Sequence, residues 1–275
     1  LQRYAAPLAS AALLDAHLKG HTKDEADALA RPLPALAPKA LAFGFTKWFM
    51  RSIGQASEGM RLGVKTGFDS GSTLDYVYRN EARGVTPFGR LVDRNYLDAI
   101  GWRGIRVRKV HAEQLIARAA MRLREHGMPV HIADIAAGHG RYVLEAVERL
   151  DASPQSVLLR DYSDSNVRDG RKLIVQKNML GFARFELANA FDESSVAAMQ
   201  PAPTLAVVSG LYELFPDNTL IRASLAGLAR AVVPGGYLVY TNQPWHPQLE
   251  FIARTLTSHR DGAAWVMRRR TQSEM

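Results

Sequence analysis

Chemistry in this sequence concentrates where an acid inside an apolar run is followed by glycines. The run from His131 to Ile135 contains Asp134, and the chain continues through Ala136 to Gly138 and Gly140. Apolar residues at helical spacing follow, so the stretch predicts a strand, a tight turn and the start of a helix. Glycines let a ligand approach the backbone, and free N–H groups at a helix start point at whatever binds there. The alternative is an ordinary strand–turn–helix unit of a parallel sheet.

Asp134 favours one class of ligand over another. A carboxylate near the core of a sheet costs free energy unless another group offsets that cost. A dinucleotide carries phosphates and does not suit an acid at this point, whereas S-adenosylmethionine carries an ammonium, a sulfonium and no phosphate. The acid therefore favours S-adenosylmethionine as the ligand of this turn.

An acid also follows the second expected strand, at a spacing that suits a ribose. Asp161 lies 23 residues after Gly138 and is followed by Tyr162. A carboxylate there can accept hydrogen bonds from two ribose hydroxyls. Nicotinamide-dependent enzymes use the same acid, so Asp161 does not separate the two cofactors, and a solvated loop acid is the structural alternative.

The third expected strand is followed by Asn189, Ala190 and Phe191. Asn189 offers an acceptor oxygen to an adenine amino group, and Phe191 could cover the adenine face. A helix cap and a core aromatic are the alternative roles of these two residues. The expected cofactor-binding residues are Asp134, Ala136, Gly138, Gly140, Asp161, Tyr162, Asn189, Ala190, Phe191, Ser209, Gly210 and Leu211.

Candidates for catalysis follow the fourth and fifth expected strands. Residues 209–211 lead into Tyr212 and Glu213, the ionisable side chains of that segment, and either could orient or deprotonate a nucleophile. Trp245 and His246 lie between two prolines after the fifth strand. His246 titrates near neutral pH and suits a general base, although a lone loop histidine is more often structural or solvated.

These residues need a sheet that brings the strand ends together. Strands are expected at residues 130–136, 156–161, 182–187, 204–209 and 236–242, and helices at 140–150, 164–178, 192–199 and 217–232. Alternation of short apolar strands with helices predicts an α/β fold with a doubly wound, mainly parallel sheet. Ligands of such sheets bind beyond the carboxyl ends of the strands, near the point where the strand order reverses.

The N-terminal part reads as helices, so residues 1–104 are expected to form a helical arm and cap, and residues 105–275 the cofactor-binding domain. Prolines break the chain at 32–38, and the segment 101–104 breaks it again before the second domain. Helices are expected at 7–20, 39–62, 87–100 and 108–126. A short helix is also expected after Thr22 and Glu25, which form a capping pair, and another after the loop at 67–72, with Ser72 and Asp75 as its caps.

Composition narrows the function classes. The 275 residues are 47% hydrophobic, enough to bury a full core, and include no cysteine. Disulfides, thiolate zinc sites and cysteine nucleophiles are therefore excluded, and a reducing cytoplasm is the expected location. No apolar run is long enough for a transmembrane helix, and the first residues lack the layout of a signal peptide. A chain that begins with Leu1 and not Met suggests a fragment or a trimmed chain.

The net charge of +8 belongs to the N-terminal half, because residues 1–130 hold 20 Lys/Arg against 12 Asp/Glu and residues 131–275 hold 15 of each. The same half carries Phe45, Trp48 and Phe49 at helical spacing. Basic residues beside aromatics suit a lipid-like acceptor and peripheral contact with a membrane. Nucleic acid is the less favoured partner, and a stripe that packs on its own domain is the structural alternative.

The strand-end features, in this order, resemble those of the class I S-adenosylmethionine-dependent methyltransferases over about residues 105–242. The sequence departs from their pattern at Ala136, where that superfamily usually has its first glycine. Four segments are also similar to a family of bacterial methyltransferases of little-defined function, often fused behind an α/β-hydrolase domain. They are Phe68-Asp69-Ser70-Gly71, Leu74-Asp75-Tyr76-Val77-Tyr78, Asp134 to Tyr142 and Gly210 to Pro216.

This resemblance implies a Rossmann-like fold, S-adenosylmethionine as the cofactor, an unidentified acceptor that is small or lipid-like, and a fused or associated hydrolase domain. The superfamily normally ends with a further helix and an antiparallel strand pair after the fifth strand. We expect these elements to be missing from this sequence, which stops at Met275. Two other classes stay open. An NAD(P)-dependent oxidoreductase would prefer a third glycine where Val143 stands. A non-catalytic module would bind nucleic acid or a membrane through the basic half.

The cap is expected to close over the cofactor through Tyr76 and Tyr78, with Arg106 or Arg108. Tyr76, Tyr78 and Trp245 are the candidates for substrate contact, although Tyr78 as a core aromatic is an equal alternative. Methyl transfer is an in-line displacement, so the enzyme need only align the nucleophile, exclude water and remove a proton. No metal is required, and no dense cluster of His, Asp and Glu offers a site for one.

Overall fold

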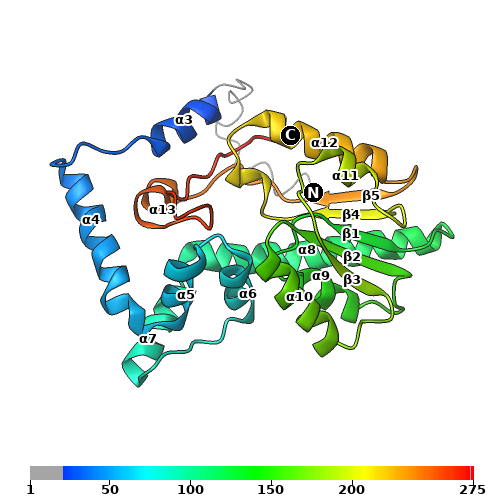
Figure 1. The fold of residues 1–275 in the computed structure, drawn as a ribbon, viewed down its shortest axis with the longest axis horizontal. Helices are drawn as coiled ribbons and strands as arrows, with labels where there is room; N and C mark the ends of the chain where they lie inside the picture. Colours follow the sequence, from blue (N-terminus) through cyan, green and yellow to red (C-terminus); the bar gives the residue numbers. More distant parts are fainter. Residues whose placement is uncertain (1–20, 273) are drawn as a thin grey trace.

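A five-stranded parallel sheet forms the centre of the computed structural model, which describes residues 21–272 and 274–275 (Figure 1). Its strand order is β3-β2-β1-β4-β5, and every pair of neighbours is parallel. The order reverses between β1 and β4, which confirms the predicted doubly wound sheet. The strands are β1 (His131–Asp134), β2 (Ser156–Asp161), β3 (Ala183–Leu187), β4 (Leu205–Val208) and β5 (Tyr237–Tyr240).

Helices cover both faces of the sheet and explain why its strands are short and apolar. Successive residues of β1 enter different cores, with Ile132 on one face and Ala133 on the other. The first face packs against α8 (Ile100–Glu125), α9 (Arg141–Glu148) and α10 (Asp164–Gln176). The second face packs against α11 (Glu193–Ala197) and α12 (Asn218–Ala231).

The cap is a helical unit with a core of its own. Tyr76, Leu97 and Trp102 pack there with Trp265 and Met267 from the C-terminal segment. The rings of Trp102 and Trp265 stack with centroids 6.0 Å apart. The C-terminal segment therefore belongs to the cap in space, although it follows the sheet in sequence. The cap elements are α3 (His21–Ala30), α4 (Pro38–Arg51), η3 (Ile53–Ala56), α5 (Glu58–Thr66), α6 (Gly71–Arg79), α7 (Pro87–Leu97) and α13 (Leu249–Thr255).

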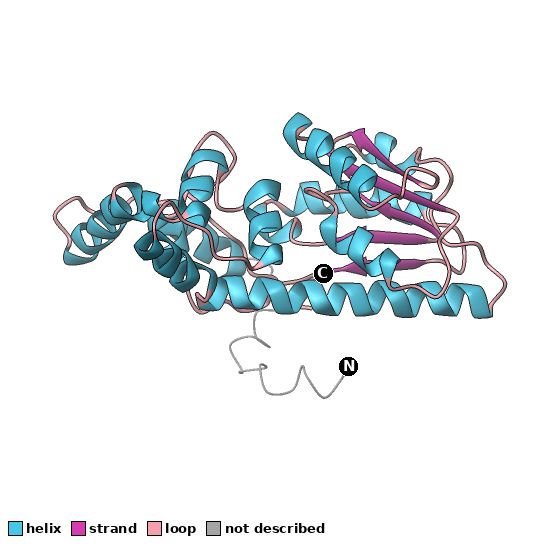
Figure 2. Ribbon diagram, turned by 90° about the horizontal axis from the view of Figure 1, so that it is seen from below, coloured by secondary structure: helices cyan, strands magenta, loops and turns pink. Residues whose placement is uncertain are grey.

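Helix α8 joins the cap to the sheet as one long rod (Figure 2). The predicted interruption at residues 101–104 is therefore wrong, and the predicted domain boundary after residue 104 falls inside this continuous helix. Two glycines there each cost about 1 kcal/mol relative to alanine. Burial of Trp102, which is 5% exposed in the cap core, is large enough to offset that cost.

The remaining cap elements differ from the sequence predictions at their ends. The segment 39–62 forms three elements and not one helix, because Ser57 starts α5 as its N-cap. Ser70 caps α6 through its side-chain oxygen, in place of the predicted Ser72 or Asp75. The helix expected at 87–100 ends at Leu97, so α7 and α8 are separate helices.

The two ends of the described chain meet, and Met275 packs against the core of the second face of the sheet. Thr22 lies inside α3 and not at its cap, and its Oγ1 donates to Glu274 at 3.2 Å. The helix predicted at 7–20 lies outside the described residues. After β5 the described chain forms α13 and no further strand, with one isolated bridge between Thr257 and Ala264. Within the described residues, no helix has the length and apolar content needed to span a bilayer.

Candidate active site

A cavity of about 900 Å³ opens at the carboxyl ends of β1, β2, β3 and β4, and we call it the strand-end cavity. This is the position at which open α/β sheets bind ligands, and the volume lies in the upper part of the usual range. The cavity brings together nearly all the expected cofactor residues. Those that line it are Ala136, Gly138, Gly140, Asp161, Tyr162, Asn189, Ala190, Phe191, Ser209, Gly210 and Leu211.

The turn after β1 is built around two glycines with positive φ. Gly138 has a φ of 58° and Gly140 a φ of 75°, values that residues with a Cβ rarely adopt. A Cβ on Gly138 would lie 3.2 Å from the Cα of Gly71 at the start of α6, and one on Gly140 would overlap Leu159. These glycines therefore serve the turn and its packing, in addition to the close ligand approach that the sequence suggests.

Asp161 holds this turn in place from the end of β2. Its Oδ2 accepts from the N–H of Gly138 at 2.9 Å, and its Oδ1 accepts from the N–H of Ser163 and Nδ2 of Asn166, both at 3.0 Å. Burial raises the pKa of this carboxyl, and the three donors act against the rise. A carboxylate has about four lone-pair sites, so roughly one is left for a ligand hydroxyl, and not the expected two.

Asp134 borders the strand-end cavity but does not line it, because its side chain is fully buried. Its Oδ2 accepts from the hydroxyl of Tyr142 at 2.5 Å, and its Oδ1 accepts weakly from the N–H of Ala136 at 3.5 Å. Burial raises the pKa of Asp134 to about 7. The expected direct contact between Asp134 and the ligand is therefore replaced by an indirect one, since Tyr142 does line the cavity.

Aromatic rings form part of the wall of the strand-end cavity. The ring of Phe191 meets the ring of Phe215 edge to face, with centroids 4.6 Å apart. Tyr162 is 58% exposed, and its ring lies 5.7 Å from the imidazole of His259. Asn189 accepts from the N–H of Phe191 at 3.0 Å, which leaves its amide N–H₂ free to meet a ligand.

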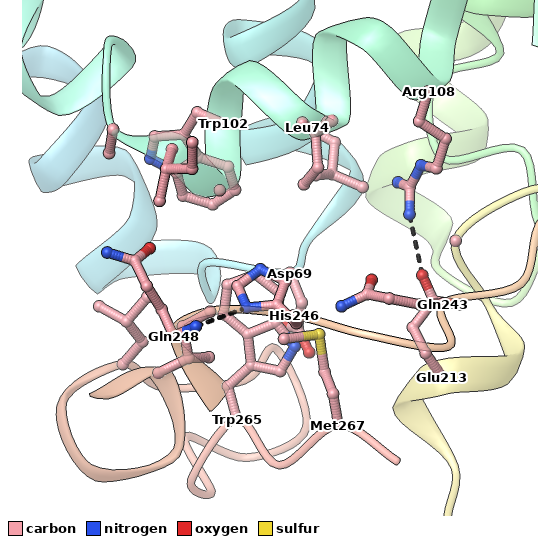
Figure 3. A pocket seen from close by; sticks show the side chains of 18 of the residues that line it. Asp69, Leu74, Trp102, Arg108, Glu213, Gln243, His246, Gln248, Trp265 and Met267 are labelled. Carbon is pink, nitrogen blue, oxygen red and sulfur yellow. Dashed lines mark hydrogen bonds and ion pairs between the residues drawn. The ribbon is translucent and has the colours of Figure 1, made fainter. Parts of the chain in front are cut away.

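A second cavity of about 900 Å³ lies between the cap, α8 and the segment that follows β5, and we call it the cap cavity (Figure 3). Its wall is largely apolar. It adjoins the strand-end cavity along a junction, because the same four residues line both. These are Asp69, Leu74, Gly210 and Leu214.

A buried ion pair lies in the wall of the cap cavity beside this junction. Nη1 of Arg108 is 2.8 Å from Oε1 of Glu213, whose side chain is 6% exposed. A Cβ on Gly210 would lie 2.7 Å from Nη2 of Arg108, so the glycine leaves room for the pair. Several polar atoms of this wall are buried without a hydrogen-bond partner among the described residues. They are Glu213 Oε2, Arg108 Nε, Gln243 Nε2, Trp265 Nε1 and the hydroxyl of Tyr96.

His246 and Trp245 also line the cap cavity. Figure 3 shows His246 beside Gln248 and Trp265, on the side away from Glu213. Nδ1 of His246 accepts from the N–H of Gln248 at 3.1 Å, and burial lowers the pKa of the imidazole. His246 is therefore neutral at neutral pH and lines the cavity, but the ion pair lies closer to the junction.

Tyr212 and Tyr76, expected as a catalytic and a substrate-contacting residue, face neither cavity. Tyr212 is 2% exposed, its hydroxyl lies 3.0 Å from Oγ of Ser224, and burial raises its pKa to about 12. The turn at residues 212–214 sends Glu213 toward Arg108 and Tyr212 into the core under α12. Tyr76 is buried in the cap core. A catalytic role for Tyr212 and a substrate contact for Tyr76 do not fit these positions.

Of the other cap residues, some reach the site and some do not. Tyr78 lines the strand-end cavity, with its ring 6.4 Å from that of Tyr142. Arg108 reaches the cap cavity, whereas Arg106 donates to the carbonyl of Leu97 at 2.8 Å and lines neither cavity. Arg106 and Arg108 are two residues apart, so they lie on opposite sides of α8, and only the side of Arg108 serves the site.

Asp69 is a site residue that the strand-end reasoning missed. Its Oδ1 accepts from the N–H of His259 at 2.6 Å, and its Oδ2 accepts from Ser258 at 2.6 Å. Burial acts to raise the pKa of Asp69, but these bonds and the His259 imidazole hold it below its usual value. The segment that resembles a known family did include Asp69, whereas no signal in the sequence pointed to His259. Across the described ranges, no three His, Asp or Glu side chains are grouped so as to hold a metal ion.

The chain matches, over residues 1–275, a protein family described as "Putative methyltransferase". One curated relative is the uncharacterised protein YnbC of Escherichia coli (strain K12), which is 54% identical over 244 residues. The alignment covers 89% of this chain and 41% of YnbC, so the chain spans about two fifths of the length of that relative.

One solved structure shares the fold at low sequence identity. A possible exported protein from Bordetella parapertussis is 15% identical with a TM-score of 0.56, over 89% of this chain and 75% of that chain. That likeness concerns the fold alone. A SAM-dependent methyltransferase from Thiobacillus denitrificans in complex with S-adenosyl-L-homocysteine is 13% identical with a TM-score of 0.33, over 41% of each chain. A score this low does not bear on function.

Proposed function

Because this chain belongs to the putative methyltransferase family, we propose that it moves a methyl group from S-adenosylmethionine in the strand-end cavity to an acceptor in the cap cavity. One observation carries the proposal. The two cavities, of about 900 Å³ each, share Asp69, Leu74, Gly210 and Leu214 as lining residues. A donor in one and an acceptor in the other would meet at this junction. Alignment and exclusion of water there are most of what methyl transfer needs.

The strand-end cavity suits S-adenosylmethionine better than a nicotinamide dinucleotide. Asp161 keeps a lone pair for a ribose hydroxyl, and Phe191 offers a ring to the base. The low pKa of Asp69 keeps a negative charge at the junction, where it would attract a cation. Val143 is fully buried where a dinucleotide-binding turn has its third glycine. When bound, the cofactor supplies an electrophilic methyl group on its sulfonium.

The cap cavity suits an acceptor with a large apolar part. Met50, Trp102, Ile105 and Trp265 are among the side chains that line it. Each Å² of apolar surface removed from water stabilises a complex by roughly 25 cal/mol. A lipid-like molecule would cover this wall, whereas a small polar acceptor would leave much of it uncovered.

Peripheral contact with a membrane belongs to the same proposal. Helix α4 exposes Leu41, Phe45 and Trp48, with exposed fractions of 60%, 65% and 56%. Lys47 and Arg51 lie on this helix, and exposed aromatics beside basic residues suit an anionic bilayer surface. Nucleic acid is the less favoured partner. We also propose a cytoplasmic location, as the cysteine-free sequence suggests, and a fused or associated α/β-hydrolase domain, as the family resemblance implies.

Isothermal titration calorimetry with S-adenosylhomocysteine and with NADH tests the proposal. We expect S-adenosylhomocysteine to bind and NADH to give no heat beyond dilution. Binding of NADH alone would assign the chain to the oxidoreductases. Binding of neither ligand would indicate a non-catalytic module.

A further inference from the structure

Three unpaired polar atoms define the chemistry of the cap cavity near the junction. Oε2 of Glu213, Nε of Arg108 and Nε2 of Gln243 are buried, and no atom of the described chain pairs with them. Buried polar atoms in native proteins nearly always have a partner, and an unpaired one is costly. The cavity therefore presents one acceptor and two donors that a bound molecule can satisfy.

The residues that carry these atoms lie toward the end of the cavity that meets the strand-end cavity. Oγ1 of Thr241 accepts from the N–H of Gly210 at 2.9 Å, which ties the segment before Gln243 to the junction. The guanidinium of Arg108 lies against the same glycine. Figure 3 shows Gln243 alongside the Arg108–Glu213 pair.

These polar atoms select among the head groups that could lie at this end of the cavity. A carboxylate would face the free oxygen of Glu213, and the charge of Arg108 is already paired at 2.8 Å. An ammonium has no lone pair, so it can neither accept from Gln243 nor attack a methyl group. A hydroxyl can donate to Oε2 of Glu213 and accept from Nε2 of Gln243, and its second lone pair stays free to attack a methyl group.

We propose that the methyl acceptor is a hydroxyl group on an apolar molecule, with its oxygen held by Glu213 and Gln243. This inference rests on the proposed function and names its acceptor atom. The hydroxyl oxygen attacks the methyl carbon, so a C–O bond forms while the S–C bond breaks and its electron pair stays on sulfur. The hydroxyl proton passes to Oε2 of Glu213 and then to solvent. The products are a methyl ether, S-adenosylhomocysteine and one proton.

Tryptophan fluorescence tests head-group selection without methyl transfer, because Trp102, Trp245 and Trp265 line the cap cavity. Octanol, octanoate and octylamine share one chain and differ in head group. We expect octanol to bind at least about tenfold more tightly than the other two, since each of those leaves buried polar atoms unpaired. Equal affinities, or tighter binding of octanoate, would overturn the inference.

Two matched variants test whether Glu213 carries this selection. Glu213→Gln keeps the size of the side chain and removes its negative charge. The preference for octanol over octanoate should fall by about tenfold or more in Glu213→Gln, because the repulsion of the carboxylate is lost. Glu186→Gln, at a side chain that is 46% exposed on β3, should keep the preference. An unchanged preference in Glu213→Gln would contradict the proposed role.

Two glycine variants locate the bound chain. An added Cβ at Gly104 or at Gly44 meets no atom within 4 Å, and both glycines are helical, but Gly104 alone of the two lines the cap cavity. Affinity for octanol should fall at least about tenfold in Gly104→Phe and hold in Gly44→Phe. Equal binding by both variants would overturn the assignment to this cavity. Binding of S-adenosylhomocysteine without a preference for octanol overturns this inference alone, whereas no binding of S-adenosylhomocysteine overturns the proposed function.

Discussion

The hydroxyl of Tyr142 donates to Oδ2 of Asp134 over 2.5 Å, between two buried side chains. Tyr142 lines the strand-end cavity and Asp134 does not, so the acid of the glycine-rich turn acts on the cavity through its neighbour. Few other groups stabilise the ionised acid, and burial raises its pKa to about 7. The role of Asp134 is thus to position Tyr142 and the turn, at a cost that depends on pH.

Replacing Asp134 by asparagine should change how stability varies with pH. The pKa of this acid is about 7 in the folded protein against 3.8 for an unperturbed side chain, so the folded state holds the proton more tightly. Its contribution to the free energy of unfolding is complete below about pH 4 and is lost as the pH rises to about 7. Asp134→Asn cannot ionise, so its stability relative to wild type should rise by about 4 kcal/mol across that window. Urea denaturation at several pH values measures the difference.

The partner variant Tyr142→Phe provides the control. The Tyr142 hydroxyl lowers the pKa of Asp134, so its removal should extend the loss of stability to higher pH. The free energy of unfolding of Tyr142→Phe relative to wild type should therefore fall as the pH rises, whereas that of Asp134→Asn should rise. Parallel stability curves for all three proteins would contradict the assignment of the pH dependence to this pair.

Asp161→Ala should weaken S-adenosylhomocysteine by roughly 1.5–3 kcal/mol, the range for a hydrogen bond to a charged group. An analogue that lacks the ribose hydroxyls should lose much less, because in the proposed binding mode the lone pair left free by Gly138, Ser163 and Asn166 would accept from a ribose hydroxyl. Calorimetry with both ligands makes the comparison. Equal losses would show that Asp161 acts only by holding the turn.

Much of the sheet was predictable because its signals are local. Each strand is a short apolar run, and the structure keeps all five within a few residues of the predicted bounds. The long helix α8 was not predictable in this way. Gly101 and Gly104 favour a break locally, whereas the packing of Trp102 on Trp265 comes from the far end of the sequence. Tertiary burial overrides local propensity there.

The site residues also divide into those that local sequence predicts and those that depend on tertiary packing. Parallel strands bring their carboxyl ends to one edge, so spacing alone placed Asp161, Asn189 and Gly210 around one cavity. Spacing does not show which way a side chain points within a turn. For this reason the sequence could not show that Tyr212 is buried in the core while its neighbour Glu213 lines the cap cavity. Contributions from the C-terminal segment, such as His259, depend on how the cap folds back.

Gly138→Val should abolish cofactor binding, with a fall in affinity for S-adenosylhomocysteine of at least about a hundredfold. A branched side chain at a φ of 58° is strained, and its Cβ would press on Gly71 of the cap. Gly181→Val is the matched control, because a Cβ there meets no atom within 4 Å. Circular dichroism confirms that both variants fold, and calorimetry measures binding. Wild-type affinity in Gly138→Val would contradict the assignment of this turn to the cofactor.

The exposed face of α4 should attach the chain to anionic liposomes. The rings of Phe45 and Trp48 lie 5.7 Å apart and are more than half exposed, so they can enter a headgroup layer together. Replacing both by alanine should reduce co-sedimentation with phosphatidylserine vesicles by at least about tenfold. Replacing the exposed Val175 and Leu180 by alanine should not. Vesicle binding should survive moderate salt because apolar burial contributes, whereas a complex with RNA would weaken steeply. Salt-sensitive binding of RNA without binding of vesicles would favour the nucleic-acid partner, and binding of neither would remove the membrane from the proposal.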